Sequence, residues 1–149
     1  MVHVECKPDE ILVSKLGFPK KQITHHQGKP RIFYALSKTQ NQFAMIDEDP
    51  GCAKTNDEKA LLFIEESEGI KYYTDKSNNK ICILKVEFED WIINACKKSK
   101  IKLSFFGLPG NSDDLHDVIN HKLPNFEKLI DELITKKNPA ISKLKDLLK

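Results

Sequence analysis

The segment Gln42-Phe43-Ala44-Met45-Ile46-Asp47-Glu48-Asp49 decides how the chain is expected to fold. Its first five residues are mostly apolar, which is the pattern of a buried strand, and acidic residues follow them directly. The β-branched run Val2–Val4 predicts an earlier strand, and residues 22–25 predict another. Helical patterns open at Pro8 and Pro30 between these runs, because proline suits the first turn of a helix. The beginning of the chain therefore predicts strand, helix, strand, helix, strand.

Strands that alternate with helices over short connections are typical of an α/β domain with a parallel sheet and right-handed crossovers. We therefore expect an open, mostly parallel sheet with flanking helices, in which the strands end at one edge. Residues 70–74 and 80–86 flank the turn-forming residues 75–79 and predict a hairpin. An apolar patch at residues 60–64 predicts a short helix, and residues 88–96 predict a longer one.

The composition changes after residue 106, which suggests a division into two parts. Residues 1–106 are expected to form the α/β domain, and residues 103–106 predict a short last strand or a loop. Residues 107–149 are expected to form a helical C-terminal extension that packs on this domain. In the extension, Asn138-Pro139 carries the cap-then-proline signature of a helix start.

Length and composition exclude several classes of protein. The chain has 149 residues, of which 40% are hydrophobic and 31% charged, and this is ordinary for a globular domain and too apolar for general disorder. The net charge of +2 does not point to bulk condensation of nucleic acid. No apolar run approaches the roughly 18 residues of a membrane helix, and Glu5 stands where a signal peptide would be apolar. The four cysteines form no CxxC pair, so we expect reduced thiols in a cytoplasmic protein without a membrane partner.

Acidic residues follow several of the predicted strands. Glu5 follows the first, Asp47 and Asp49 follow the third, and Glu87 and Glu89 follow a later one. Ligands of open parallel sheets bind outside the carboxyl ends of the strands, so these carboxylates are expected to converge. Such a cluster repels itself unless a cation is present, and oxygen ligands favour a hard ion, magnesium or manganese. All five acids are therefore candidate metal ligands.

These motifs resemble those of a known family. The stretch from Val4-Glu5-Cys6 to Glu10, followed some forty residues later by Asp47-Glu48-Asp49, resembles the TOPRIM fold of topoisomerases, DnaG-type primases and OLD-family nucleases. The signature of that fold is a glutamate after the first strand and Asp-x-Asp after the third. The resemblance covers about residues 1–100 and is nearest to small stand-alone bacterial TOPRIM-like proteins. Cys6 stands where the family usually has glycine, and this departure favours loss of activity.

The resemblance implies magnesium-dependent (or manganese-dependent) phosphoryl transfer on nucleic acid. In such a protein Asp47 and Asp49 would bind metal, and Glu5 would act as a general base, a general acid or a further ligand. A nuclease would be the most fitting activity, with phage defence or DNA repair as its setting. Some small relatives of this kind act with an ATPase protein partner. No tyrosine stands in a setting that indicates a topoisomerase, and no zinc-binding module indicates a primase.

Basic residues stand at the predicted helix starts. Lys7 follows Glu5 at one start, and Lys29 and Arg31 lie at another. A helix N-terminus combined with lysine or arginine suits phosphate oxygens, so these three residues are candidate phosphate ligands.

Two other interpretations compete with a metal-dependent nuclease. The chain could be a non-catalytic or conditionally active subunit of a larger ATPase-containing complex, which an exposed apolar patch on the C-terminal helices would favour. It could also be an ordinary α/β domain whose acids lie there by chance. That interpretation predicts that Glu5, Asp47 and Asp49 are scattered.

Overall fold

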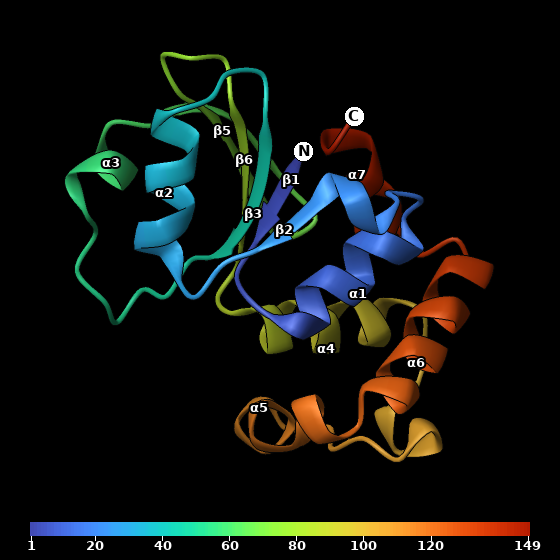
Figure 1. The fold of residues 1–149 in the computed structure, drawn as a ribbon. Coiled ribbons are helices and arrows are strands. Elements are labelled where there is room, and N and C mark those ends of the chain that lie inside the picture. The colour runs from blue at the N-terminus through green and yellow to red at the C-terminus, as the bar shows by residue number, and fades with distance from the viewer.

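The computed structural model describes residues 1–149 and contains a six-stranded sheet with helices on both faces (Figure 1). The strands are β1 (Val2–Val4), β2 (Ile23–His25), β3 (Phe43–Asp47), β4 (Leu62–Ser67), β5 (Ile70–Thr74) and β6 (Lys80–Leu84). The α-helices are α1 (Lys7–Lys15), α2 (Lys29–Ser37), α3 (Asn56–Lys59), α4 (Phe88–Lys98), α5 (Ser112–Val118), α6 (Leu123–Thr135) and α7 (Pro139–Leu147). Short 3-10 turns are η1 (Lys20–Gln22), η2 (Leu103–Phe106) and η3 (Ile119–His121).

The sheet has the strand order β2-β1-β3-β6-β5-β4. The first four strands in this order are parallel to one another, and β5 and β4 continue the sheet in antiparallel pairing. This arrangement confirms the α/β fold with an open, mostly parallel sheet. The hairpin expected from residues 70–86 is also confirmed, since β5 pairs antiparallel with β6.

The two faces of the sheet carry hydrophobic clusters of different size. On β3, Met45 belongs to a cluster of 29 buried residues, whereas Ala44 and Ile46 belong to a cluster of seven on the other face. This alternation follows from the two-residue period of a strand. Helices α1, α4, α6 and α7 contribute to the larger cluster, and α2 covers the smaller one (Figure 1). None of the helices combines the length and the apolar character needed to cross a membrane.

The C-terminal helices share the core of the sheet. Phe126 of α6 is fully buried and meets the ring of Phe88 of α4 edge-on, with ring centroids 5.7 Å apart. Asn138 precedes α7 and accepts hydrogen bonds from the backbone N–H groups of Ala140 and Ile141. Its amide also donates to the carbonyl oxygen of Ala95 at 2.7 Å, which fixes the start of α7 against α4. The extension and residues 1–106 therefore contribute to one hydrophobic cluster.

The prediction of a short helix at residues 60–64 is wrong. Residues 62–67 form the edge strand β4, and the helix α3 ends before them, at Lys59. Thr55 begins this helix by accepting a hydrogen bond from the backbone N–H of Glu58. The apolar residues that follow belong to β4, which pairs with β5 and forms the edge of the sheet. Aromatic and β-branched side chains favour a strand. Residues 103–106, expected as a strand or a loop, form the 3-10 turn η2.

We expect Phe126→Ala to destabilise the whole domain, because the substitution leaves a cavity in the shared core. The loss in free energy of unfolding should be about 3–5 kcal/mol, measured by urea unfolding. Phe105→Ala provides the control, since Phe105 is 83% exposed. A two-step transition in the Phe126 variant, with the sheet unfolding as in the wild type, would show that the C-terminal helices form a separate unit.

Candidate metal centre

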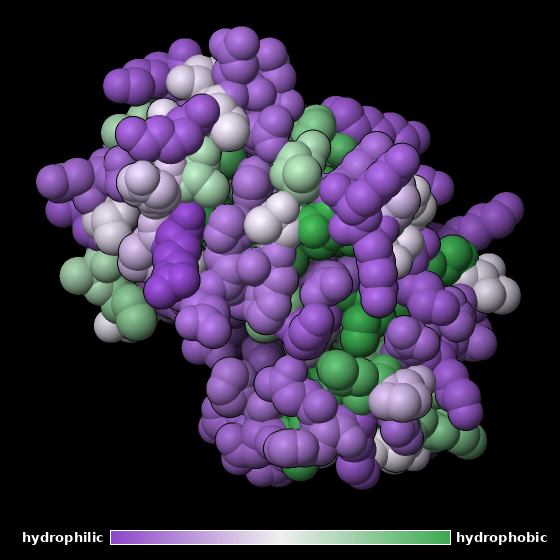
Figure 2. Space-filling model, in the orientation of Figure 1, coloured by the Kyte–Doolittle hydropathy of each residue, from purple (hydrophilic) through white to green (hydrophobic).

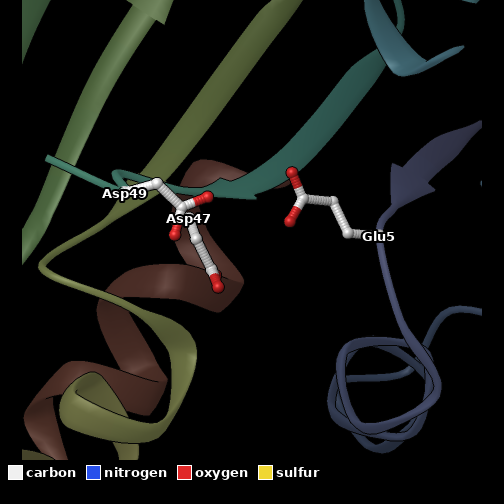
Figure 3. A group of neighbouring side chains, drawn as sticks. All are labelled: Glu5, Asp47 and Asp49. Carbon is white, nitrogen blue, oxygen red and sulfur yellow. The ribbon is translucent and has the colours of Figure 1, made fainter. Parts of the chain in front are cut away.

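The parallel pairing of β1 with β3 brings the predicted acids together. Val4 at the end of β1 is level with Met45 of β3, so Glu5 and Asp47 leave the same edge of the sheet side by side. Asp49 follows two residues later, after the chain has turned. Figure 3 shows Glu5 extending from the end of β1 toward the two aspartates at the end of β3. Carboxylate oxygens of the three residues all lie within 4.8 Å of one another. The expectation of scattered acids is therefore contradicted, and these three residues are called the acidic triad below.

The turn after β3 points the three acids of the Asp-x-Asp segment in two different directions. Asp49 has a φ of +46° and donates its backbone N–H to the carbonyl oxygen of Val86 at 3.1 Å. Glu48 lies outside the triad, and its carboxylate forms an ion pair with Lys71 of β5 at 2.5 Å. The Asp-x-Asp segment thus presents its first and third acids to the triad and its middle acid to β5, which is two strands away from β3 in the sheet.

Asp9 is a fourth acid that the sequence analysis did not single out. It lies in the first turn of α1, is only 2% exposed, and its Oδ1 atom has no hydrogen-bond partner. The Oε1 atom of Glu5 is likewise buried without a partner. Unsatisfied buried carboxylate oxygens are costly, so these two atoms indicate a missing proton or cation. The sequence feature that could have indicated Asp9 is its spacing of four residues from Glu5 across a helix start. Acids in the first turn of a helix are, however, usually explained by their favourable interaction with the helix dipole.

Burial raises the pKa values of these acids. Desolvation raises the pKa of Glu5 to about 8, and the charge of Asp47 adds to this effect, whereas Lys29 opposes it. Desolvation also raises the pKa of Asp47 to about 7, against a backbone hydrogen bond from Phe88 that lowers it. Burial, followed by the charge of Asp47, raises the pKa of Asp9 well above its usual range. In the absence of a cation, the centre therefore holds protons near neutral pH.

Cys6 stands at the position where the TOPRIM pattern usually has glycine, and it does not distort the backbone. Its φ of −146° is extended, so the position does not require glycine. The thiol interacts with Asp9, and burial raises the pKa of the Cys6 thiol. The cysteine is therefore a neutral neighbour of the acids. Like Cys52, Cys82 and Cys96, it is a free cysteine, as expected.

Lys29 is a cation in direct contact with the triad. Its ammonium nitrogen lies 3.6 Å from Oδ2 of Asp49 and 3.3 Å from Oε1 of Glu58. It also donates to the carbonyl oxygen of Glu48 at 3.2 Å. Lys29 thus pairs with acidic residues in the structure. The role of Lys29 as a phosphate ligand stays a prediction. Glu58, 6% exposed at its side chain, was not anticipated from the sequence.

The other two candidate phosphate ligands lie on the surface. The side chain of Lys7 is 58% exposed and pairs with Glu10 on the same helix. Arg31 is exposed and takes part in none of the ion pairs of the structure. Neither residue forms an ion pair with the triad, and their predicted role as phosphate ligands stays a prediction.

A second group of acids borders the triad on the side of α5. Asp47 and Asp49 line a cleft of about 540 Å³ together with Glu87, Asp113, His116 and Asp117. Glu89 is buried, and its Oε1 atom accepts a hydrogen bond from Nδ1 of His116 at 2.9 Å. Glu87 precedes α4 and Glu89 lies in its first turn; the structure places Glu87 in the cleft and Glu89 against His116. Figure 2 shows mostly hydrophilic side chains over the lower part of the molecule, where α5 lies in Figure 1.

A cavity of about 300 Å³ lies on the opposite side of the triad. Glu5, Asp49 and Lys29 line it together with residues at the start of α2 and in the segment before α3. Helix α2 begins after Gly28, whose φ is +99° and which offers no side-chain cap. The first backbone N–H groups of α2 therefore have no side-chain acceptor from the N-cap residue. Such a helix start favours an anion. The same cavity is also lined by the carboxylates of Glu5, Glu48, Asp49 and Glu58.

The donor set of the triad fits a divalent cation. The ligand atoms are carboxylate oxygens, which magnesium and manganese prefer, and they are close enough to share one ion. The unpartnered Oε1 atom of Glu5 gives independent support, because a cation would satisfy it. The triad can therefore hold a metal ion, although these residues do not identify which metal.

Comparisons with known proteins do not assign the chain to a family. No protein-family model matches it, and neither curated proteins nor solved structures gave a significant match.

The raised pKa values predict that the metal-free protein loses stability as the pH rises. The pKa of Glu5 is about 8 in the folded protein against 4.5 for a free side chain, so the folded state binds this proton more tightly. The stabilisation is complete below about pH 4.5 and is lost as the pH rises toward about 8. Across this window, the free energy of unfolding of Glu5→Gln should decrease with pH less steeply than that of the wild type. The two slopes should differ by about 1 kcal/mol per pH unit.

The measurement is urea unfolding in a chelating buffer at a series of pH values. Glu127→Gln, at an exposed position on α6, is the matched control and should follow the wild-type curve. Parallel curves for the wild type and the Glu5 variant would contradict the raised pKa.

Proposed function

We propose that the protein is a metal-dependent phosphoryl-transfer enzyme that acts on nucleic acid, and specifically a small TOPRIM-type nuclease. The observation that carries the proposal is the acidic triad, in which carboxylates from the ends of two adjacent parallel strands lie within 4.8 Å of one another. A glutamate after the first strand and Asp-x-Asp after the third is the pattern of the TOPRIM fold. Phage defence or DNA repair would be a fitting setting.

Each residue of the centre has a role in this proposal. Asp47 and Asp49 would hold magnesium or manganese, and Glu5 would complete the ligand set or transfer a proton. When bound, the ion would offset the negative charge that develops on the phosphate. Glu5 is suited to proton transfer because its pKa of about 8 lies near neutral pH. Asp9 is a further buried acid of the centre, and burial, followed by the charge of Asp47, raises its pKa.

The first test is calorimetric titration of the metal-free protein with Mg²⁺ and Mn²⁺. The wild type should bind saturably, and Asp47→Asn and Asp49→Asn should each weaken binding by at least about tenfold, since each removes a charged ligand. At pH 7, binding should also release roughly one to two protons per ion, seen as a heat that depends on the buffer, because Glu5 and the protonated fraction of Asp47 must ionise. Glu127→Gln should bind as the wild type does. Absence of binding to the folded wild type would overturn the proposal.

The second test concerns activity on nucleic acid. With Mn²⁺, the wild type should nick or cleave labelled DNA or RNA, and Asp47→Asn should reduce the rate by about 100-fold or more, because it removes charge stabilisation of the transition state. Activity is measured on single-stranded and double-stranded substrates in parallel. Cleavage that persists in the Asp47 variant would come from a contaminant and would count against this centre.

A second candidate function is a conditionally active subunit of an ATPase-containing complex. The observation that favours it is the edge strand β4, on which Leu62, Phe63 and Ile64 are 62%, 59% and 43% exposed. The apolar patch thus lies on the sheet edge, whereas the C-terminal helices expose only Ile134 among large hydrophobic residues. Metal binding by the wild type without cleavage of any substrate would favour this candidate.

A further inference from the structure

Lys29 is held within the acidic centre at a fixed position. It is the first residue of α2, and its side chain is only 14% exposed. The three oxygen atoms nearest its ammonium group belong to Asp49, Glu58 and the backbone of Glu48, at 3.6, 3.3 and 3.2 Å. Two of these contacts are hydrogen bonds, donated to Glu58 and to the carbonyl oxygen of Glu48, and the contact with Asp49 is an ion pair.

The surroundings of this ammonium group are of the kind that bind a hard cation. Two carboxylates and one backbone carbonyl form an all-oxygen set, which is the ligand set that magnesium, manganese and calcium use in proteins. The site therefore contains a second place suited to a cation, next to the triad, and the ammonium group of Lys29 fills it.

Asp49 belongs to both places. Its Oδ2 atom faces Lys29, and the same side chain is a member of the triad. In two-metal sites, the ions stand about 3.5–4 Å apart and clamp the same reacting phosphate group. Here Asp49, the acid that two such ions would share, contacts the ammonium group of Lys29 and is also a member of the triad.

The contacts of Lys29 also oppose a metal ion at its own place. Its ammonium group pairs with the carboxylates of Asp49 and Glu58. A divalent ion there would have to displace this ammonium group or stand beside it, where the two positive charges repel each other.

We infer that Lys29 occupies the place of a second metal ion, so that the centre takes one divalent cation and uses lysine as its fixed partner. This inference rests on the proposed function, since it concerns the same centre. Lys29 acts in it as a positioning residue that holds Asp49 and supplies a positive charge beside the start of α2. The centre would then bind a substrate phosphate between one metal ion and one ammonium group.

The test is the number of Mn²⁺ ions bound per chain, measured by calorimetry and by electron paramagnetic resonance of the metal-loaded protein. The wild type should bind one ion and give the six-line signal of an isolated Mn²⁺. Lys29→Met keeps the aliphatic part of the side chain and removes its charge. This variant should bind a second ion, with the spectrum of a coupled pair.

Two further variants separate the charge of Lys29 from its structural role. Lys29→Arg keeps a cation and should bind one ion, like the wild type. Lys38→Met removes an exposed cation just after the same helix and should also leave the count at one. Circular dichroism establishes that each variant is folded.

The outcomes distinguish failure of this inference from failure of the proposed function. A wild type that binds two coupled ions overturns the inference, whether or not the Lys29 variants fold. A folded Lys29→Met variant that binds only one ion overturns it as well, and in both cases the metal centre itself stands. A wild type that binds no ion overturns the proposed function and the inference together.

Discussion

The in-register parallel pairing of β1 with β3 is the interaction on which the rest of the centre depends. It sets Val4 level with Met45, so that the residues after both strands leave the sheet at the same edge. The pairing is fixed by burial, because a shift of one residue would turn Val2 and Val4 away from the larger hydrophobic cluster. The free energy of burying this cluster therefore holds the carboxylates together against their mutual repulsion.

The electrostatics of the centre follow from this enforced proximity. Removal from water is the main cause that raises the pKa values of Glu5 and Asp47 to about 8 and about 7, and the charges of neighbouring acids add to it. Asp9 adds a buried carboxyl with an unpartnered oxygen. Lys29 is the only lysine or arginine that forms an ion pair with the triad, and it is shared with Glu58. The folded protein thus provides a place where a proton or a metal ion is required, which is the physical basis of the proposed function.

The surroundings of the triad are asymmetric, and this asymmetry bears on how a substrate could approach. On the side of α5, the acidic cleft would repel a phosphate backbone. On the other side, the cavity near the start of α2 is lined by acids, Glu5, Asp49 and Glu58 among them, and also by Lys29 at the start of a helix without a side-chain cap. Lys29 is therefore the feature by which this side differs from the cleft at α5. The exposed apolar residues of β4 lie on a different part of the sheet and would suit a protein partner.

The sequence by itself determined the α/β fold, the hairpin and the convergence of Glu5, Asp47 and Asp49, because these depend on local patterns and on the shared direction of parallel strands. It led to an error at residues 60–64, where a short apolar run has no period that distinguishes a helix from a strand and pairing with β5 decided the outcome. Only the tertiary structure decided the parts played by Asp9, Glu58 and Lys29. Their roles depend on burial and on distances between side chains far apart in the chain, which local patterns do not encode.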